Sequence, residues 1–234
     1  MTKLERTSEK LKAGVGILTN QTTTIQLNTA TVEILIGGPY KSKKGEINNY
    51  GHAALRVISA TEERIYDFGR YGATKGLFGE QGEGILRVWD KFETYISGEN
   101  AYGRNTTGFS YTVPNEKTLA VNRYFEKMTS GAKERVAKHP NQREFKLNED
   151  YDAIKNNCAT MTLSGAKIAL PTIDSEAQLY NSGRGMSDVE KTAAKAQNFG
   201  WPSKIFMPED VQSMLENNKR TPAKKITIYG KGRK

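Results

Sequence analysis

The one cysteine of this 234-residue chain, Cys158, lies where a thiol could act as a nucleophile. Asn157, directly before it, is of a type favoured at helix N-caps, and Ala159, Leu163 and Ala166 then recur on one helical stripe. This pattern predicts a helix with Cys158 in its first turn, where the partial positive charge of the helix N-terminus lowers the pKa of a thiol. A cysteine in an amphipathic helix can equally be a small core residue, so the helix by itself leaves both roles open.

A base for such a thiol is available in His52, one of two histidines in the sequence. Alternation places Ala53, Leu55 and Val57 on one face of a predicted strand and His52 on the other. An imidazole that projects from a strand toward a thiol at a helix start is the geometry that a cysteine hydrolase needs. The other histidine, His139, lies in a polar segment typical of a solvated turn, so His52 is the predicted base. The alternative for His52 is a structural or surface histidine.

A carboxylate that could hold the imidazole in its working tautomer is Asp67, on the next predicted strand. If residues 61–62 form a two-residue turn, however, Asp67 lies opposite Arg56, about 13 Å along the strand from His52. Tyr71 is then nearer to His52, and an Asp67–Arg56 ion pair is the structural alternative. A shifted register or a bulge would bring Asp67 to the histidine. Asp67 is the predicted orienting residue.

The elements that must position these groups follow from hydrophobic periodicity and turn residues. Strands are predicted at residues 31–37, 50–58, 64–68, 85–89, 108–113 and 225–229. Helices are predicted at residues 116–128, within 153–170, and at 187–197 and 208–218. Because strands come first and helices follow, with one helix near the middle, the sequence favours an α+β domain.

Composition restricts the class of protein further. The formal charge of +9 predicts attraction to polyanions, although part of it lies in a basic C-terminal tail, and no motif indicates sequence-specific nucleic-acid binding. A single cysteine forms no internal disulfide. No apolar run approaches the ~20 residues of a membrane span, and the N-terminal residues do not resemble a cleavable signal peptide. We therefore expect a protein without a membrane span that either stays in the cytoplasm or leaves by a route that needs no such signal.

A Gly-His strand at 51–52, a second strand after it, and an Asn-Cys helix start much later together resemble the permuted branch of the NlpC-type papain-like superfamily. Relatives in that superfamily include lecithin–retinol acyltransferase-like proteins and bacterial cell-wall amidases. The resemblance covers roughly residues 31–170 and implies a papain-like cysteine hydrolase that uses neither cofactor nor metal. In it, His52 matches the general base and Cys158 the nucleophile, with a polar orienting residue on the next strand.

Together with the composition of the two ends, this resemblance gives a predicted division of the chain into three parts. Residues 1–30 are a polar lead-in, 31–170 a papain-like catalytic domain with an antiparallel sheet packed against the cysteine helix, and 171–234 a mostly helical extension packed on the same domain. The glycine-dense segment 69–84 is either a flap beside the cleft or a plain surface loop.

Other residues near the motif are candidates for substrate contact. Tyr50, Tyr66 and Asn157 are predicted to contact substrate, with core or surface packing as the alternative for the tyrosines and helix capping as the simpler role for Asn157. Backbone N–H groups at the start of the Cys158 helix are expected to hold the oxyanion.

The function expected from the resemblance is cleavage of peptide or amide bonds in peptidoglycan. The setting expected with it is a secreted antibacterial toxin, delivered by an apparatus such as type VI secretion to the target-cell periplasm and neutralised by an immunity protein. Two alternatives stay open. One is an enzyme of the same fold that acts on lipid acyl groups or modifies proteins, and the other is a non-catalytic basic binding module in which Cys158 is core.

Overall fold

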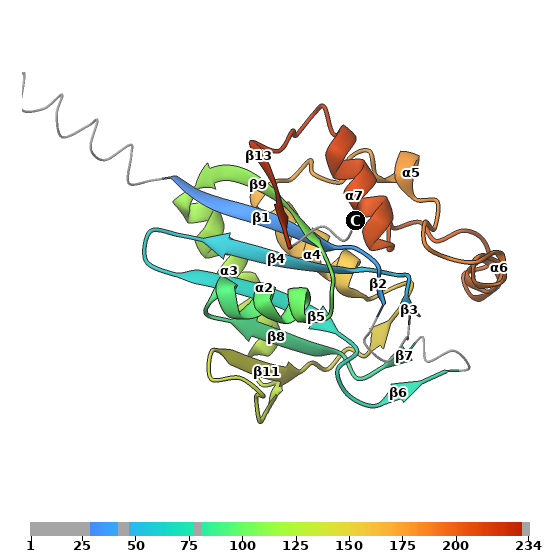
Figure 1. Cartoon of the computed structure of the whole chain (residues 1–234), viewed down its shortest axis with the longest axis horizontal. Coiled ribbons are helices and arrows are strands. Elements are labelled where there is room, and N and C mark those ends of the chain that lie inside the picture. The colour runs from blue at the N-terminus through green and yellow to red at the C-terminus, as the bar shows by residue number, and fades with distance from the viewer. Residues whose placement is uncertain (1–28, 42–46, 77–80, 231–234) are drawn as a thin grey trace, which may run out of the picture.

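An eight-stranded antiparallel sheet is the largest feature of the computed structural model, which describes residues 29–41, 47–76 and 81–230 (Figure 1). Its strands lie side by side in the order β10 (Lys133–Arg135), β11 (Gln142–Lys146), β8 (Ile85–Trp89), β5 (Glu63–Gly69), β4 (His52–Ile58), β1 (Thr29–Gly37), β9 (Thr106–Pro114) and β13 (Lys225–Tyr229). All six strands predicted from the sequence are present, with ends that differ by two residues at most. The predicted α+β class with an antiparallel sheet is confirmed.

The side chains of the central strands alternate between the two faces of the sheet, and a hydrophobic core covers each face. In β4, Ala53, Leu55 and Val57 point to one face of the sheet and belong to the main core. Ala54 points to the opposite face, where it packs in a smaller core with Leu35 of β1. Because both faces of these strands are covered, their hydrophobic side chains are almost completely removed from water.

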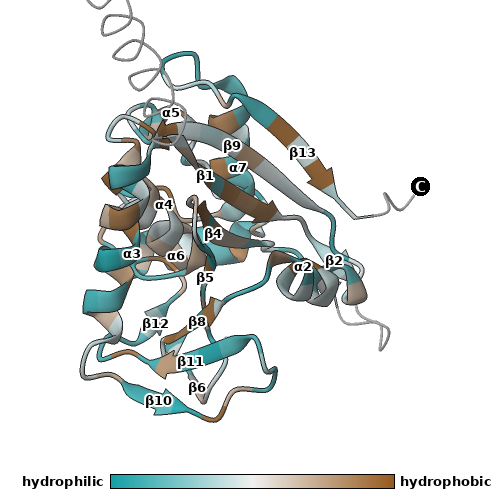
Figure 2. Ribbon diagram, turned by 90° about the vertical axis from the view of Figure 1, so that its left-hand side faces the viewer, coloured by the Kyte–Doolittle hydropathy of each residue, from teal (hydrophilic) through white to brown (hydrophobic). Residues whose placement is uncertain are grey.

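Helices cover both faces of this sheet. α3 (Asn115–Thr129), α4 (Cys158–Ala169) and α7 (Pro208–Asn217) pack on the face of the main core. α2 (Phe92–Ala101), which the sequence analysis did not predict, packs on the opposite face, so that Figure 2 shows α2 and α3 on opposite sides of the strands. Since α4 packs along β4 and β5, its first residue is brought to the end of β4 where His52 lies.

The helix predicted within 153–170 is α4, which begins at Cys158 after the predicted N-cap Asn157. The short strand before it, β12 (Tyr151–Asp152), was not predicted. β12 pairs with β7 (Gln81–Gly82), which pairs with β6 (Thr74–Lys75), and together they form a small three-stranded sheet. The glycine-dense segment therefore contains a short hairpin, although its residues 77–80 lie outside the described part. A further two-stranded ribbon joins β2 (Tyr40–Lys41) to β3 (Ile47–Asn48).

The segment after residue 170 is part of the same body. It contains α5 (Ala177–Tyr180), α6 (Asp188–Gln197) and α7, and it ends in β13, which pairs with β9 at the edge of the main sheet. Of the predicted lead-in, residues 1–28 lie outside the described residues and 29–30 begin β1. None of the described helices is long and apolar enough to cross a bilayer.

Candidate active site

The turn between β4 and β5 decides where Asp67 lies. Ile58 pairs with Glu63, so residues 59–62 form the turn and not residues 61–62 alone. The register is thereby shifted by two residues, which brings Asp67 diagonally across from His52. His52 Nε2 and Asp67 Oδ1 are 2.6 Å apart, and both side chains are buried. The structure therefore brings these two predicted site residues into contact.

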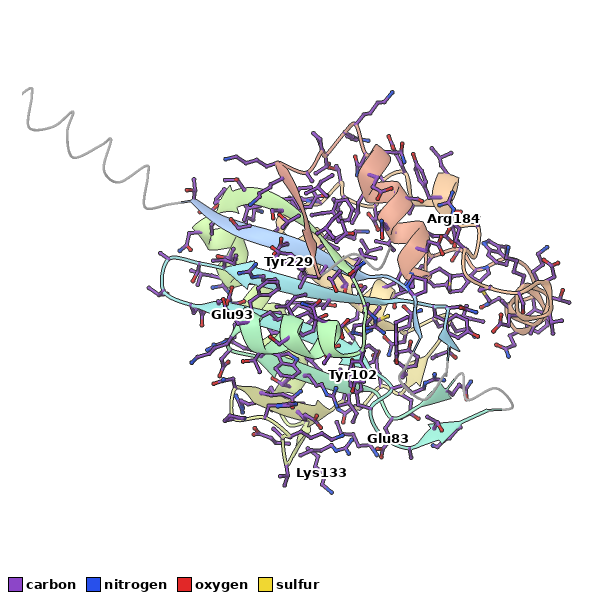
Figure 3. All side chains as sticks on the ribbon, viewed as in Figure 1. Glu83, Glu93, Tyr102, Lys133, Arg184 and Tyr229 are labelled. Atoms are coloured by element: carbon purple, nitrogen blue, oxygen red, sulfur yellow. The ribbon has the colours of Figure 1, made fainter. Side chains whose placement is uncertain are left out.

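Arg56, the alternative partner of Asp67, binds other carboxylates. Its guanidinium lies 2.9 Å from Glu33 and 2.5 Å from Glu63. The hydroxyl of Tyr229, which is labelled in Figure 3, donates to Glu33 at 2.9 Å. This ion-pair network satisfies the buried Glu33 and leaves Asp67 to His52.

Tyr71 holds the carboxylate of Asp67 from a second side. Its hydroxyl donates to Asp67 Oδ1 at 2.8 Å and lies 3.3 Å from His52 Nε2. The guanidinium of Arg87 lies 3.4 Å from the centre of the Tyr71 ring and is itself bound to Glu144 at 2.8 Å. Burial would raise the pKa of Asp67, but the charge and hydrogen bond of His52, the charge of Arg87 and the Tyr71 hydroxyl lower it. Asp67 therefore stays ionised at neutral pH.

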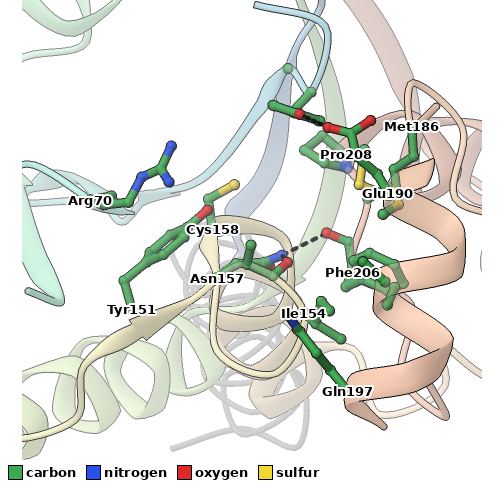
Figure 4. A pocket seen from close by; sticks show the side chains of 16 residues that line it. Arg70, Tyr151, Ile154, Asn157, Cys158, Met186, Glu190, Gln197, Phe206 and Pro208 are labelled. Atoms are coloured by element: carbon green, nitrogen blue, oxygen red, sulfur yellow. Dashed lines mark hydrogen bonds between the residues drawn. The ribbon is translucent and has the colours of Figure 1, made fainter. Parts of the chain in front are cut away.

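The start of α4 is fixed by a capping box. The side-chain oxygen of Asn157 accepts the Thr160 N–H at 3.0 Å, and the Thr160 hydroxyl accepts the Asn157 N–H at 2.8 Å. The Asn157 amide group also donates to the carbonyl oxygens of Ala153 at 2.6 Å and Phe206 at 2.8 Å, the latter drawn dashed in Figure 4. The amide group of Asn157 thus uses its donors within the protein and fixes the position of Cys158. Asn157 also lines the pocket beside the thiol, but it has no free N–H group to offer an oxyanion.

Cys158 and His52 form a charged pair. His52 Nε2 faces Asp67, which leaves Nδ1 for the sulfur. Burial would raise the pKa of the Cys158 thiol, but the charge of His52, its hydrogen bond and the N–H of Ala53 lower it below its usual value. Burial would lower the pKa of His52, but the charges of Asp67 and Cys158 and hydrogen bonds to both raise it to about 10. Both shifts favour the ion pair, a thiolate beside an imidazolium, over the neutral thiol and imidazole.

Tyr151 on β12 is a site residue that the sequence analysis missed. Tyr151 lies beside Cys158 in Figure 4, and its hydroxyl forms a hydrogen bond with Cys158. Its ring lies 5.7 Å from that of Phe68. Burial, followed by the charge of Cys158, raises the pKa of Tyr151 well above its usual value, while the charge of Arg70 opposes the rise. The phenol therefore stays protonated and is a hydrogen-bond donor beside the sulfur.

Cys158 is only 5% exposed, but it lines a pocket that is open to solvent. The wall near the sulfur includes Arg70 and Tyr151, and Tyr50 also lines the pocket (Figure 4). The far wall comes from the segment after residue 170 and includes Met186, Glu190, Ala194, Phe206, Met207 and Pro208 (Figure 4). The C-terminal extension thus completes the pocket around the thiol.

The two tyrosines predicted to contact substrate lie in different places. Tyr50 lines the pocket, and its hydroxyl donates to Glu190. Tyr66 points into the main core, where its ring stacks on Phe125 at 3.9 Å and its hydroxyl donates to Asn122 at 3.0 Å. Tyr66 is therefore a core residue and not a pocket residue. Side chains along β5 alternate between the two faces of the sheet, and that of Tyr66 lies on the face of the main core.

Nucleophilic acyl transfer requires the chemical groups that meet here: a thiolate, an imidazolium, an orienting carboxylate and a hydrogen-bond donor beside the sulfur. Among the residues that the structure describes, no group of three or more His, Cys, Asp or Glu side chains is placed to hold a metal ion. Comparisons with protein-family models, with curated proteins and with solved structures find no match for this chain.

Proposed function

We propose that this chain is a cysteine hydrolase in which Cys158 is the nucleophile, His52 the general acid and base, and Asp67 the residue that orients His52. The observation that carries this proposal is the contact series from the thiol to His52 and on to Asp67, at the edge of a pocket. The cysteine helix packed against the strand that bears the histidine also supports a papain-like fold of the permuted NlpC type.

In the first half of the reaction, the Cys158 thiolate attacks the acyl carbon, and the carbonyl electron pair moves onto oxygen. The N–H groups of the first helical turn have no acceptor within the helix, so that of Cys158 can bind this oxyanion together with the Tyr151 hydroxyl. His52 then gives its proton to the leaving nitrogen, the carbon–nitrogen bond breaks, and a thioester remains.

In the second half, neutral His52 takes a proton from water as the water oxygen attacks the thioester. Collapse of this intermediate releases the acid and the thiolate, which again faces an imidazolium. Asp67 stabilises the imidazolium in both halves, since its Oδ1 lies 2.6 Å from His52 Nε2.

Replacing Tyr151 by Phe is expected to slow acylation by p-nitrophenyl acetate by roughly tenfold to a hundredfold, because one oxyanion donor is lost. Alkylation by iodoacetamide, measured where the thiol is fully ionised, should change little, since it passes through no oxyanion. The matched control is Tyr111→Phe, because the Tyr111 hydroxyl is buried without a hydrogen-bond partner in the described residues. Equal acylation rates in the two variants would show that the phenol does not hold the oxyanion.

The substrate that we propose is a peptide or amide bond of peptidoglycan. Charged and polar side chains on both sides of the thiol suit a peptide, and the formal charge of +9 favours binding to an anionic wall polymer. In this proposal the protein acts as a secreted antibacterial toxin in the periplasm of a target cell, and an immunity protein is its expected partner.

The apolar side chains of the far wall, Ala194, Phe206 and Met207 among them, favour a second candidate, hydrolysis of lipid acyl esters. Incubating the protein with purified sacculi and with anionic phospholipid vesicles separates the two. We expect new amino groups to be released from sacculi and no fatty acid from vesicles, with Cys158→Ala inactive on both. Fatty-acid release without any cleavage of sacculi would replace the first substrate by the second.

A further inference from the structure

Arg70 is a cation at the pocket for which the described residues supply no anionic partner. It directly follows β5, is exposed, and lines the same pocket as Cys158. Within the described ranges, no carboxylate lies at ion-pair distance from its guanidinium, whereas the less exposed Arg56, Arg87 and Arg104 each have one. As far as the described residues show, the guanidinium is therefore available to a ligand at the pocket of the thiol.

The position of Arg70 is set by its neighbours. Its stem lies against Gly82 of β7, where an added Cβ would come within 3.0 Å of the Arg70 Cγ. Its guanidinium carbon lies 5.8 Å from the ring centre of Tyr151, whose hydroxyl contacts the Cys158 sulfur. The cation is thus held one side chain away from the sulfur while its donors remain directed to the pocket (Figure 4).

The opposite wall has the reverse charge. Glu190 on α6 lies across the pocket from Arg70, with Cys158 between them in Figure 4. Glu190 already accepts hydrogen bonds from Tyr50 and from Ser187, so it is held in place as an anion, and these bonds contribute to lowering its pKa. A substrate anion is therefore attracted to the Arg70 side and repelled from the Glu190 side, which fixes the direction in which a substrate lies.

We propose that Arg70 binds a carboxylate of the substrate beside the scissile bond, which makes acidic acyl compounds the preferred substrates; this inference rests on the proposed hydrolase function. The planar guanidinium presents paired N–H donors that match a carboxylate in a bidentate arrangement. Since only Tyr151 separates Arg70 from the sulfur, the bound carboxylate belongs to the residue at the scissile bond or to the one next to it.

Two alkylating reagents of nearly equal size test this proposal without knowledge of the natural substrate. Iodoacetate carries a carboxylate next to the carbon that the sulfur attacks, and iodoacetamide carries a neutral amide there. We expect Arg70→Gln to lower the rate with iodoacetate about tenfold relative to the rate with iodoacetamide, a typical effect of losing a hydrogen-bonded charge. Both rates are measured by mass spectrometry at a pH where the thiol is fully ionised, so that a change in its pKa does not enter.

Arg123→Gln is the matched control, since Arg123 is exposed on α3, has no ion pair among the described residues, and does not line the pocket. It changes the net charge by the same amount. A rate ratio that is unchanged in Arg70→Gln, or that falls equally in Arg123→Gln, would overturn the role of Arg70 while leaving the hydrolase proposal intact. A native thiol inert to both reagents would instead overturn the proposed function, and the Arg70 proposal with it.

Discussion

Cys158→Ala is expected to abolish the acylation burst with p-nitrophenyl acetate and the cleavage of sacculi, by roughly a thousandfold or more. The thioester cannot form without the sulfur, and no other thiol in the chain can replace it. Cys158→Ser keeps nearly the same volume and should be almost as inactive, because a serine hydroxyl is not ionised by His52 at neutral pH. The burst is followed by the absorbance of released nitrophenolate.

Folding of these variants can be checked by thermal unfolding. The buried cluster contains Cys158 and Asp67, whose pKa values are lowered, and His52, whose pKa is raised. Replacing Cys158 by alanine leaves the ion pair of His52 and Asp67, whose net charge is zero. The midpoint temperature of unfolding should therefore fall only by the small amount that loss of the sulfur from a packed core causes. Turnover that persists in folded Cys158→Ala would exclude this cysteine as the nucleophile.

The parts of the fold that could be predicted are those with a local pattern. The central strands alternate cleanly, and α4 begins with a capping residue that is visible in the sequence at Asn157. α2 has neither signal: it begins after Lys91 without a side-chain cap, contains Gly98, and buries few residues, Phe92 and Tyr95 among them. α2 is stabilised by packing in the small core on the second face of the sheet. That core exists only after the sheet has formed.

The strands at the far edge of the sheet were missed for a different reason. β10 and β11 are rich in charged residues and show no apolar alternation. Ion pairs cross these edge strands: Arg143 of β11 lies 2.8 Å from Glu134 of β10, and Glu144 of β11 lies 2.8 Å from Arg87 of β8. Opposite charges that are far apart in the sequence become a strand signal only when the pairing is known.

Within the site, the pairing of Asp67 with His52 depended on the length of one turn. The sequence contained a signal for the longer turn, because Ser59 stands at its start. Its hydroxyl accepts the N–H groups of Thr61 and Glu62 at 3.3 and 3.1 Å and donates to the Glu62 carbonyl. Serine side chains stabilise turns in this way, and weighing Ser59 would have favoured the observed register.

Tyr151 and the far wall of the pocket had no comparable signal. Tyr151 stands in an acidic stretch, seven positions before Cys158, and its contact with the sulfur requires the short sheet that β12 forms with β7. The far wall is joined to the cysteine helix by the bond from Asn157 to the carbonyl of Phe206, 49 residues away. Such long-range contacts follow from tertiary packing and not from any local pattern.

His52→Ala is expected to remove the low-pH reactivity of Cys158 and to lower turnover by about a hundredfold to ten-thousandfold. In the native protein the pKa of the thiol is lowered, so iodoacetamide should react well below the pH expected for a free pKa of about 8.5. Without His52, burial and the charge of Asp67 remain and both raise the pKa of Cys158. The reaction with iodoacetamide should therefore begin only at a pH above that of a free thiol.

His139→Ala is the matched control, because His139 is exposed, stacks beside Trp89 at 5.5 Å, and does not line the pocket. It should leave the pH profile of alkylation unchanged. If the native thiol reacted only after unfolding, with or without His52, Cys158 would be a core residue and the hydrolase proposal would fail. A low-pH thiolate that survives in His52→Ala would instead assign the lowered pKa to the start of α4 and the Ala53 N–H, and His52 would then not be the base that activates the thiol.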